Sequence, residues 1–240
     1  MRRELNSRKW YRLPKWEDLP DNLRTDEVRP YYDALSKHRG GLVVKRAFDI
    51  VAGCVTFVVL AIPMGVMAVM IKKDSEGPVF YRQERVTAYG GIFRIHKFRT
   101  MVNNADKLGT AVTVSGDSRI TKVGAKLRDH RLDEFPQVLD VLLGDMSFVG
   151  TRPEAVKYVE RYTPEMMATL LLPAGITSEA SVKFKDEAEL LENAENADET
   201  YVKEILPKKM EINLRAVREF SLGRDFRTLL GTVLEVFLKK

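Results

Sequence analysis

One uncharged segment constrains this chain more than any other feature. Residues 50–71, IVAGCVTFVVLAIPMGVMAVMI, hold 22 consecutive residues without a charge, and about 20 apolar residues suffice to cross a bilayer as a helix. The segment is apolar on every face, whereas a core helix of a soluble protein, which is the alternative, usually has one polar side. It begins at position 50 and lacks a small-residue cleavage site, so it does not resemble a signal peptide. We therefore predict a membrane helix.

The charges around this segment predict how it enters the membrane. Basic residues lie on both sides of it, Lys37, Arg39, Lys45 and Arg46 before it and Lys72 and Lys73 after it. Basic flanks favour the cytoplasm, so both ends are expected on the same side of the bilayer. Pro63 lies near the centre, where a proline removes a helical hydrogen bond. We predict a re-entrant helix-break-helix over residues 42–73, with the break at Pro63.

Residues 1–41 form a basic N-terminal extension. Residues 1–46 contain 12 Lys and Arg against 7 Asp and Glu, a net charge of +5 that accounts for the whole excess of the chain. Trp10, Tyr11 and Trp16 lie among these basic residues, and such rings favour the lipid interface. A solvated or partner-binding arm is the alternative. No basic and aromatic pattern typical of RNA binding occurs elsewhere, so we expect no nucleic-acid partner.

The composition excludes several catalytic classes. Cys54 is the single cysteine, which rules out an internal disulfide and makes a Cys/His nucleophile improbable. The three histidines show no spacing typical of a zinc site. A chain of 240 residues can form one domain with a modest core. We expect residues 74–240 to be a globular cytoplasmic domain.

An acidic pair within residues 126–154 carries the strongest chemical pattern. Asp133 and Glu134 precede a short apolar run that ends at Gly144, which predicts an amphipathic helix with both acids at its N-terminus. Free N–H groups and the helix dipole there keep a carboxylate ionised. An ionised aspartate can attack phosphorus, and its neighbour can hold a divalent cation. A solvated helix cap is the ordinary alternative for such a pair.

Three basic side chains complete a pattern suited to phosphate. Arg128 lies five residues before Asp133, and Arg152 lies in the loop 150–154, where a glycine allows close backbone approach. Guanidinium forks match phosphate oxygens. Lys97 belongs to residues 93–101, whose alternation predicts a half-buried strand with a basic face. A hairpin turn is predicted just before it, over residues 83–91.

The remaining segments carry less chemistry. Residues 102–125 predict a loop with short helical pieces, and the acidic residues 183–204 predict a solvated helical region. The C-terminal segment predicts an amphipathic helix. This helix is expected either to lie in the membrane interface or to pack on the globular core. Its apolar stripe consists of Phe226, Leu229, Leu230, Val233 and Phe237.

Ordered motifs through most of the chain resemble the bacterial sugar transferases, the monotopic polyprenyl-phosphate glycosyl-1-phosphate transferases, in their short single-domain form. The motifs are Lys45–Asp49, Lys72–Phe80, Gln83–Arg85, Phe93–Met101, Leu132–Gln137, Gly144–Ser147 and Arg152–Glu154. The resemblance implies a mixed α/β, mainly helical fold with a small β-hairpin. In such a fold a re-entrant membrane helix and interfacial amphipathic helices hold a cytoplasmic catalytic domain.

The resemblance also implies an activity. The enzyme would face the cytoplasm from the bacterial inner membrane as a monotopic protein and initiate glycoconjugate assembly. It would move a sugar 1-phosphate from a UDP-sugar to undecaprenyl phosphate, releasing UMP through a covalent intermediate on Asp133. Glu134 and Asp133 would hold Mg²⁺, with Mn²⁺ equally open. The substrate-binding residues would be Lys97, Arg128, Arg152 and Glu154.

The expected partners are the UDP-sugar, undecaprenyl phosphate and membrane phospholipid, and a homo-oligomer is left open. Two other functions use the same features. An aspartyl-phosphate phosphohydrolase acting on lipid diphosphates would release phosphate without an acceptor. A non-catalytic membrane scaffold would tolerate loss of the acidic pair. Adding a UDP-sugar with and without the lipid acceptor separates the three.

Overall fold

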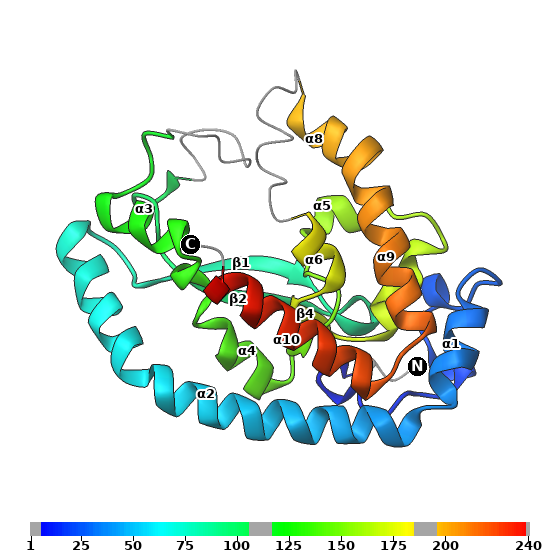
Figure 1. Cartoon of the computed structure of the whole chain (residues 1–240). Helices are drawn as coiled ribbons and strands as arrows, with labels where there is room; N and C mark the ends of the chain where they lie inside the picture. Colours follow the sequence, from blue (N-terminus) through cyan, green and yellow to red (C-terminus); the bar gives the residue numbers. More distant parts are fainter. Residues whose placement is uncertain (1–5, 106–116, 185–195, 239–240) are drawn as a thin grey trace.

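The structure, a computed structural model, describes residues 6–105, 117–184 and 196–238, and only the backbone of residues 197 and 236–238. It is mainly helical and has two small sheets (Figure 1). The α-helices are α1 (Arg29–Ser36), α2 (Arg39–Asp74), α3 (Lys122–Asp129), α4 (Gln137–Leu143), α5 (Val156–Val159), α6 (Glu179–Lys183), α8 (Ala197–Thr200), α9 (Leu206–Arg218) and α10 (Leu222–Leu238). The strands are β1 (Phe80–Val86), β2 (Ile92–Phe98), β3 (Met146–Val149) and β4 (Ala174–Thr177). The shorter turns are η1 (Ser7–Lys9), η2 (Trp16–Asp18), η3 (Asp21–Leu23), η4 (Ala88–Gly90), η6 (Leu132–Glu134), η7 (Met166–Leu171) and the π-helical η8 (Tyr201–Ile205).

The predicted membrane segment lies in α2, a helix of 36 residues. Figure 1 shows α2 running along the lower edge of the molecule and curving upward toward its C-terminal end. Both ends pack on the globular body through Leu42, Lys45, Asp49 and Gly53 at the first end and Met67 and Ile71 at the second. Between Gly53 and Met67 no residue of α2, which is described throughout, is buried, and Ile62 is 80% exposed. The apolar middle of α2 is therefore left for another apolar environment, as a membrane helix requires.

The predicted break at Pro63 is absent, because α2 keeps helical geometry through this residue. A proline removes one backbone donor and clashes with the preceding turn, and a helix can absorb both effects by bending. The prediction of two helices was therefore wrong, and α2 is one curved helix. The sequence shows where a helix is weak but not whether it ends there.

Residues 6–38 are part of the core rather than a separate arm. Trp10 is 0% exposed and lies in one hydrophobic cluster with Tyr89, Leu171 and Phe220. The hydroxyl of Tyr89 donates a hydrogen bond to the carbonyl oxygen of Trp10 at 3.2 Å. We expected an interfacial or solvated arm, and burial of its apolar residues corrects that expectation. The basic residues between the apolar ones remain at the surface, which is why the charge pattern was misleading.

The predicted hairpin is confirmed. β1 and β2 pair in antiparallel register, with Val86 opposite Ile92 beside the turn. Tyr89 and Gly90 within the turn have φ of 59° and 77°, conformations that let the chain reverse tightly. Phe93 packs against α4 and β3 in a second apolar cluster. Because side chains alternate along a strand, Lys97 lies on the same face as Phe93, further along β2.

A second sheet was not predicted. β3 and β4 pair in parallel, with Met146 opposite Ala174. Each has four residues, too few to show alternation in the sequence. Gly175 lies so close to Gly150 that a Cβ there would overlap backbone atoms. This close pairing fixes the point where β3 passes into the loop that carries Arg152.

Two predicted segments lie only partly among the described residues. Of residues 102–125, positions 106–116 lie outside them, and the described end enters α3. Of residues 183–204, positions 185–195 lie outside them, and the described part contains α8 and most of η8.

The predicted C-terminal helix is confirmed as α10. Its apolar stripe does not simply close on the core, because Phe226 is 63% and Leu230 48% exposed. Leu222, Val233 and Leu234 are also exposed, whereas the side chain of Phe237 lies outside the described residues. The exposed stripe favours the interfacial alternative for this helix.

Candidate functional site

The acidic pair lies in the turn that leads into α4. Asp133 and Glu134 belong to η6, and α4 begins three residues later at Gln137. Arg131 has a left-handed backbone with φ of 54°, which turns the chain out of α3 toward η6. Helix α4 ends at Gly144, whose φ of 89° suits glycine. The predicted helix and its end are confirmed, but the acids occupy its entrance rather than its first turn.

Glu134 is the centre of a cluster of charges from three elements. Lys97 of β2 donates a hydrogen bond from Nζ to Oε1 of Glu134 at 2.9 Å. Arg152 reaches the same carboxylate with two N–H groups, at 2.5 Å to Oε1 and 3.3 Å to Oε2. The sequence predicted these residues as members of one site, and the structure brings their charged groups together.

These contacts fix the charge of Glu134. Burial alone would raise its pKa, but Arg152 and Lys97 outweigh burial and hold the pKa well below its usual range. Burial lowers the pKa of Lys97, and Glu134 opposes that effect. Glu134 is therefore ionised at neutral pH and neutralises part of the positive charge around it.

Asp133 is in a different state from its neighbour. Burial raises its pKa, Lys97 opposes the rise, Glu134 adds to it and Arg128 opposes it again. The helix N-terminus therefore does not hold this carboxylate ionised as strongly as we expected. In the described part of the chain its side chain has no hydrogen bond or ion pair to another side chain. Its oxygens remain available to an incoming group.

Arg128 and Glu154 take different places. Arg128, in α3, lies close enough to Asp133 to oppose part of the rise that burial causes in the pKa of that carboxyl. Glu154 is buried, accepts a hydrogen bond of 2.5 Å from the hydroxyl of Tyr201, and lies 3.6 Å from Nζ of Lys209. Arg128 therefore joins the acidic pair, whereas Glu154 belongs to an adjoining internal cluster.

Two supporting arginines were not assigned a role from the sequence. Arg85 of β1 donates a hydrogen bond to the carbonyl oxygen of Pro153 at 3.3 Å, next to Arg152. Arg46 of α2 donates to the carbonyl oxygens of Val141 and Leu142, at 2.6 and 2.9 Å, near the end of α4. Both lie in motifs of the family resemblance, which was the available signal. Arg85 supports the arginine loop, and Arg46 attaches α4 to the membrane helix.

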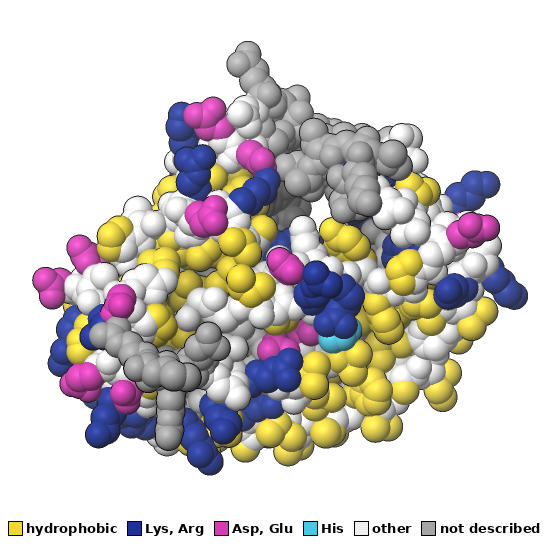
Figure 2. Space-filling view, turned by 180° about the vertical axis from the view of Figure 1, so that it is seen from behind, with side chains coloured by type: hydrophobic (Ala, Val, Ile, Leu, Met, Phe, Trp, Pro, Cys, Tyr) yellow, Lys and Arg dark blue, Asp and Glu magenta, His cyan; other side chains and the backbone are white. Residues whose placement is uncertain are grey.

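The surface separates apolar from charged side chains. Figure 2, seen from behind, shows hydrophobic side chains along much of the lower edge, the edge along which α2 runs in Figure 1. Lysine, arginine and acidic side chains gather in the middle of this face. The molecule thus presents an apolar edge and a charged centre side by side.

The donor set fits a metal that arrives with a phosphate ligand. Among the described residues no group of three His, Cys, Asp or Glu side chains could hold a metal alone. Mg²⁺ is commonly held by one or two carboxylates, with substrate phosphates and water completing the shell. Among the described residues the side chain of Asp133 has no side-chain partner, and Oε2 of Glu134 accepts a long hydrogen bond from Arg152 at 3.3 Å. Two adjacent carboxylates with free lone pairs meet that requirement.

Comparison with known protein families assigns the chain to one of them. The family model described as Bacterial sugar transferase matches residues 41–239. The chain belongs to the bacterial sugar transferase family. The match includes all of α2 but its first two residues, both sheets and the acidic pair, and the resemblance seen in the motifs is confirmed. Residues 6–38, which complete the hydrophobic core, lie before it.

Several relatives within this family carry named activities. An Aeromonas hydrophila UDP-N-acetylgalactosamine-undecaprenyl-phosphate N-acetylgalactosaminephosphotransferase is 34% identical over 79% of this chain and 43% of its own length. An Escherichia coli UDP-glucose:undecaprenyl-phosphate glucose-1-phosphate transferase is 35% identical over 89% and 44%. A Caulobacter vibrioides transferase of the same name is 34% identical over 79% and 68%. The chain thus spans less than half the length of the first two relatives.

Proposed function

We propose that this sugar transferase family member moves a sugar 1-phosphate from a UDP-sugar to undecaprenyl phosphate and releases UMP. The observation that carries the proposal is the contrast within the acidic pair. Glu134 is held by Lys97 and Arg152, whereas among the described residues Asp133 beside it has no side-chain partner. One carboxylate is organised for charge balance, and the other is open for attack. The named activities of the relatives support the same reaction.

In the first step a carboxylate oxygen of Asp133 attacks the phosphorus that bears the sugar. A bond from this oxygen to phosphorus forms, the bond from that phosphorus to the oxygen shared with UMP breaks, and UMP leaves with the electron pair. Arg128 and Arg152 are the cations that stabilise the charge developing on the phosphate oxygens. The product is an aspartyl-phosphosugar.

In the second step a phosphate oxygen of the polyprenyl acceptor attacks the same phosphorus. The bond to Asp133 breaks, its carboxylate is restored, and a polyprenyl-diphosphate sugar leaves. The two substrates react in turn with one side chain, so the kinetics are expected to be ping-pong. Lys97 adds positive charge beside a centre where anionic groups must approach each other.

Mg²⁺ or Mn²⁺ would be held by Glu134 together with Asp133 and the diphosphate. When bound, it would offset the charge that repels an anionic nucleophile. The role of this chain's residues is to keep Glu134 ionised, through Arg152 and Lys97, so that an oxygen ligand is present at neutral pH.

We infer that α2 enters and leaves the membrane on the cytoplasmic side. Leu42 near one end and Ile71 near the other are both buried against the same body, while the middle is exposed and apolar. Basic residues lie at both ends. A helix crossing the bilayer would carry its two ends to opposite sides, away from a shared body. The monotopic arrangement brings a soluble donor and a lipid acceptor to one interface.

UMP release tests the reaction directly. Purified, detergent-solubilised protein is given a panel of UDP-sugars with Mg²⁺, with and without undecaprenyl phosphate, and wild type is compared with Asp133→Asn and Glu134→Gln. We expect sustained UMP release only when the acceptor is present. We expect Asp133→Asn to lower this release by at least about a thousandfold. Phosphate release without an acceptor would support the phosphohydrolase instead. Undiminished activity in Asp133→Asn would exclude this residue as the nucleophile.

Cysteine labelling tests the placement of α2. In a Cys54→Ser background, single cysteines replace Lys37, just before α2, and Lys73, in its last turn. A membrane-impermeant maleimide should label both in inside-out vesicles and neither in intact, right-side-out spheroplasts. Labelling of the two positions from opposite sides would establish a spanning helix and contradict the inference.

A further inference from the structure

An apolar pocket opens between the membrane helix and the C-terminal helix. It has a volume of about 200 Å³ and is walled by α2, β3 and the first half of α10. Val44 and Phe226 at its edges are 54% and 63% exposed. These residues belong to the two apolar surfaces that we place at the membrane. The full lining is Val44, Lys45, Phe48, Asp49, Phe148, Val149, Leu222, Asp225, Phe226 and Leu229.

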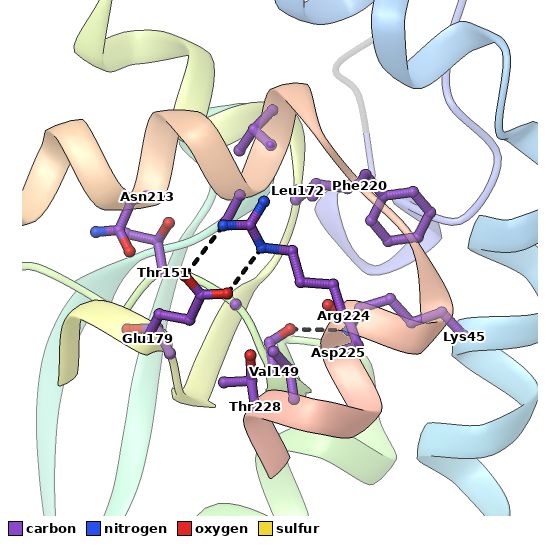
Figure 3. A pocket seen from close by; sticks show the side chains of 14 residues that line it. Lys45, Val149, Thr151, Leu172, Glu179, Asn213, Phe220, Arg224, Asp225 and Thr228 are labelled. Atoms are coloured by element: carbon purple, nitrogen blue, oxygen red, sulfur yellow. Dashed lines mark hydrogen bonds and ion pairs between the residues drawn. The ribbon is translucent and has the colours of Figure 1, made fainter. Parts of the chain in front are cut away.

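The charged groups of this pocket are engaged except at one atom, because among the described residues Oδ2 of Asp49 is buried without a hydrogen-bond partner. Nζ of Lys45 donates to Oδ2 of Asp225 at 2.6 Å and to the carbonyl oxygen of Val149 at 2.8 Å. Figure 3, a close view of the neighbouring pocket, shows Lys45 and Asp225 meeting between α2 and α10. Oδ1 of Asp49 accepts hydrogen bonds from Ser147 and from the backbone of Phe148. With its lysine paired, the pocket offers hydrocarbon contact rather than a phosphate site.

The pocket also lies next to the strand that leads to the reaction centre. Val149 lines the pocket and ends β3, and Arg152, which binds Glu134, follows three residues later. Three residues span at most about 11 Å of chain. A ligand bound at Arg152 by its phosphate, with a hydrocarbon chain several times longer than that, can therefore extend to the pocket.

We propose that this pocket holds part of the isoprenoid chain of the lipid acceptor. The inference rests on the proposed function, because a polyprenyl phosphate is the one substrate with both a phosphate for Arg152 and a long apolar chain. Helices α2 and α10 form two sides of the pocket, and the exposed rings of Phe48 and Phe226 line it from these helices. Burial of the chain here would direct its phosphate toward Asp133.

Neighbouring valines on α2 provide a matched test. Val44 lines the pocket and Val43 does not, although the two are 54% and 51% exposed. We expect Val44→Trp to fill the pocket and raise the acceptor KM for undecaprenyl phosphate about five- to tenfold. For a phosphate carrying only two isoprene units, which is too short to fill the pocket, its KM should stay near the wild-type value. Val43→Trp should match wild type with both acceptors.

A second pair of residues, on α10, allows the same comparison by truncation to alanine. Phe226 lines the pocket, whereas Leu230, also exposed on α10, does not. Phe226→Ala should raise the KM for the long acceptor, and Leu230→Ala should not. The melting temperature and the amount of UMP released in a single turnover without acceptor check that each variant is folded and completes the first step.

Several results would overturn the proposal. Equal changes in the acceptor KM for Val44→Trp and Val43→Trp would show that the pocket takes no part in acceptor binding. A KM rise for the short acceptor equal to that for the long one would place the defect at the reaction centre. An effect present only when phospholipid is added to the micelles would identify phospholipid as the occupant.

A crosslinking experiment separates this inference from the proposed function. Failure of wild type to release UMP with any acceptor would count against the proposed function. A photoreactive polyprenyl phosphate still tests the pocket in that case. Crosslinks to residues 44–49 or 222–229 would support it, and crosslinks confined to other segments would contradict it.

Discussion

Arg8 and Asp145, 137 residues apart in the sequence, meet in a two-point ion pair. Nε of Arg8 donates to Oδ1 of Asp145 at 2.8 Å, and Nη2 of Arg8 donates to Oδ2 at 2.9 Å. Asp145 is buried, and its carbonyl oxygen also accepts a hydrogen bond from Thr87 in the hairpin turn. The N-terminal segment is thereby joined to the start of β3 and to the hairpin.

Removal of Arg8 should lower stability measurably. Arg8→Ala leaves the buried carboxylate of Asp145 without its partner, which we expect to cost about 1–3 kcal/mol of unfolding free energy. Arg8→Lys should recover only part of this, because a lysine cannot form the two-point contact. Thermal unfolding in detergent measures the change. The control is Lys9→Ala, an exposed neighbour, and equal melting temperatures for the two alanine variants would contradict the prediction.

Trp10 should act as a core residue and not as a lipid anchor. Its side chain is 0% exposed, so Trp10→Ala opens a large cavity and should cost about 3–5 kcal/mol. Trp10→Phe should cost less, since Nε1 of Trp10 is buried without a hydrogen-bond partner. Melting temperature and the membrane-bound fraction are measured together. Loss of membrane binding at an unchanged melting temperature would restore the interfacial role that burial excludes.

Gly175 should tolerate no side chain. A Cβ at this position would overlap the backbone of Gly150, so Gly175→Ala must push β3 and β4 apart. We expect a loss of at least about 2 kcal/mol together with reduced UMP release, because the strand before Arg152 is displaced. Gly231→Ala in α10 is the control, since its Cβ meets nothing within 4 Å. If both variants behaved alike, the close strand contact would not be present in solution.

Glu179 should make stability depend on pH. The hydrogen bonds from Arg224, at 2.7 and 3.0 Å and drawn in Figure 3, lower the pKa of Glu179 in the folded protein. A lowered pKa gives stability that is present above the unfolded pKa and is lost as pH falls through the folded pKa. Between about pH 6 and pH 3, wild type should therefore lose more stability than Glu179→Gln. The difference is modest, about 1 kcal/mol or less, because the pair is partly exposed. The melting temperatures of both proteins are measured across this pH range, and an equal fall in wild type and Glu179→Gln would contradict the assignment.

The sequence predicted much of the site because its signals are local. The alternation in β2 placed Lys97 on one face of a strand, and Gly144 marked the end of the helix after the acidic pair. The short distance in sequence from the acidic pair, and the fit of guanidinium groups to phosphate, supplied Arg128 and Arg152. The contact between Arg152 and Glu134, in contrast, depends on the parallel pairing of β3 and β4. Strands of four residues are too short for this pairing to be predicted from alternation in the sequence.

Other features could not be predicted because they depend on packing. The charges of residues 1–46 suggested a membrane arm, whereas the apolar residues between them fill the core around Trp10. Pro63 suggested a break, but the helix bends through it. The different states of Asp133 and Glu134 follow from which carboxylate the distant cations reach, which adjacent positions in a sequence do not reveal.

The most direct test of the account is a search for the covalent intermediate. Wild type is incubated with the UDP-sugar that supports UMP release, without acceptor, quenched in acid and analysed by peptide mass spectrometry. The account predicts one added sugar phosphate on the peptide containing Asp133, absent from Asp133→Asn and removed when undecaprenyl phosphate is added before quenching. Acceptor-dependent UMP release by a wild-type protein that never carries this adduct would contradict it, because transfer would then be direct.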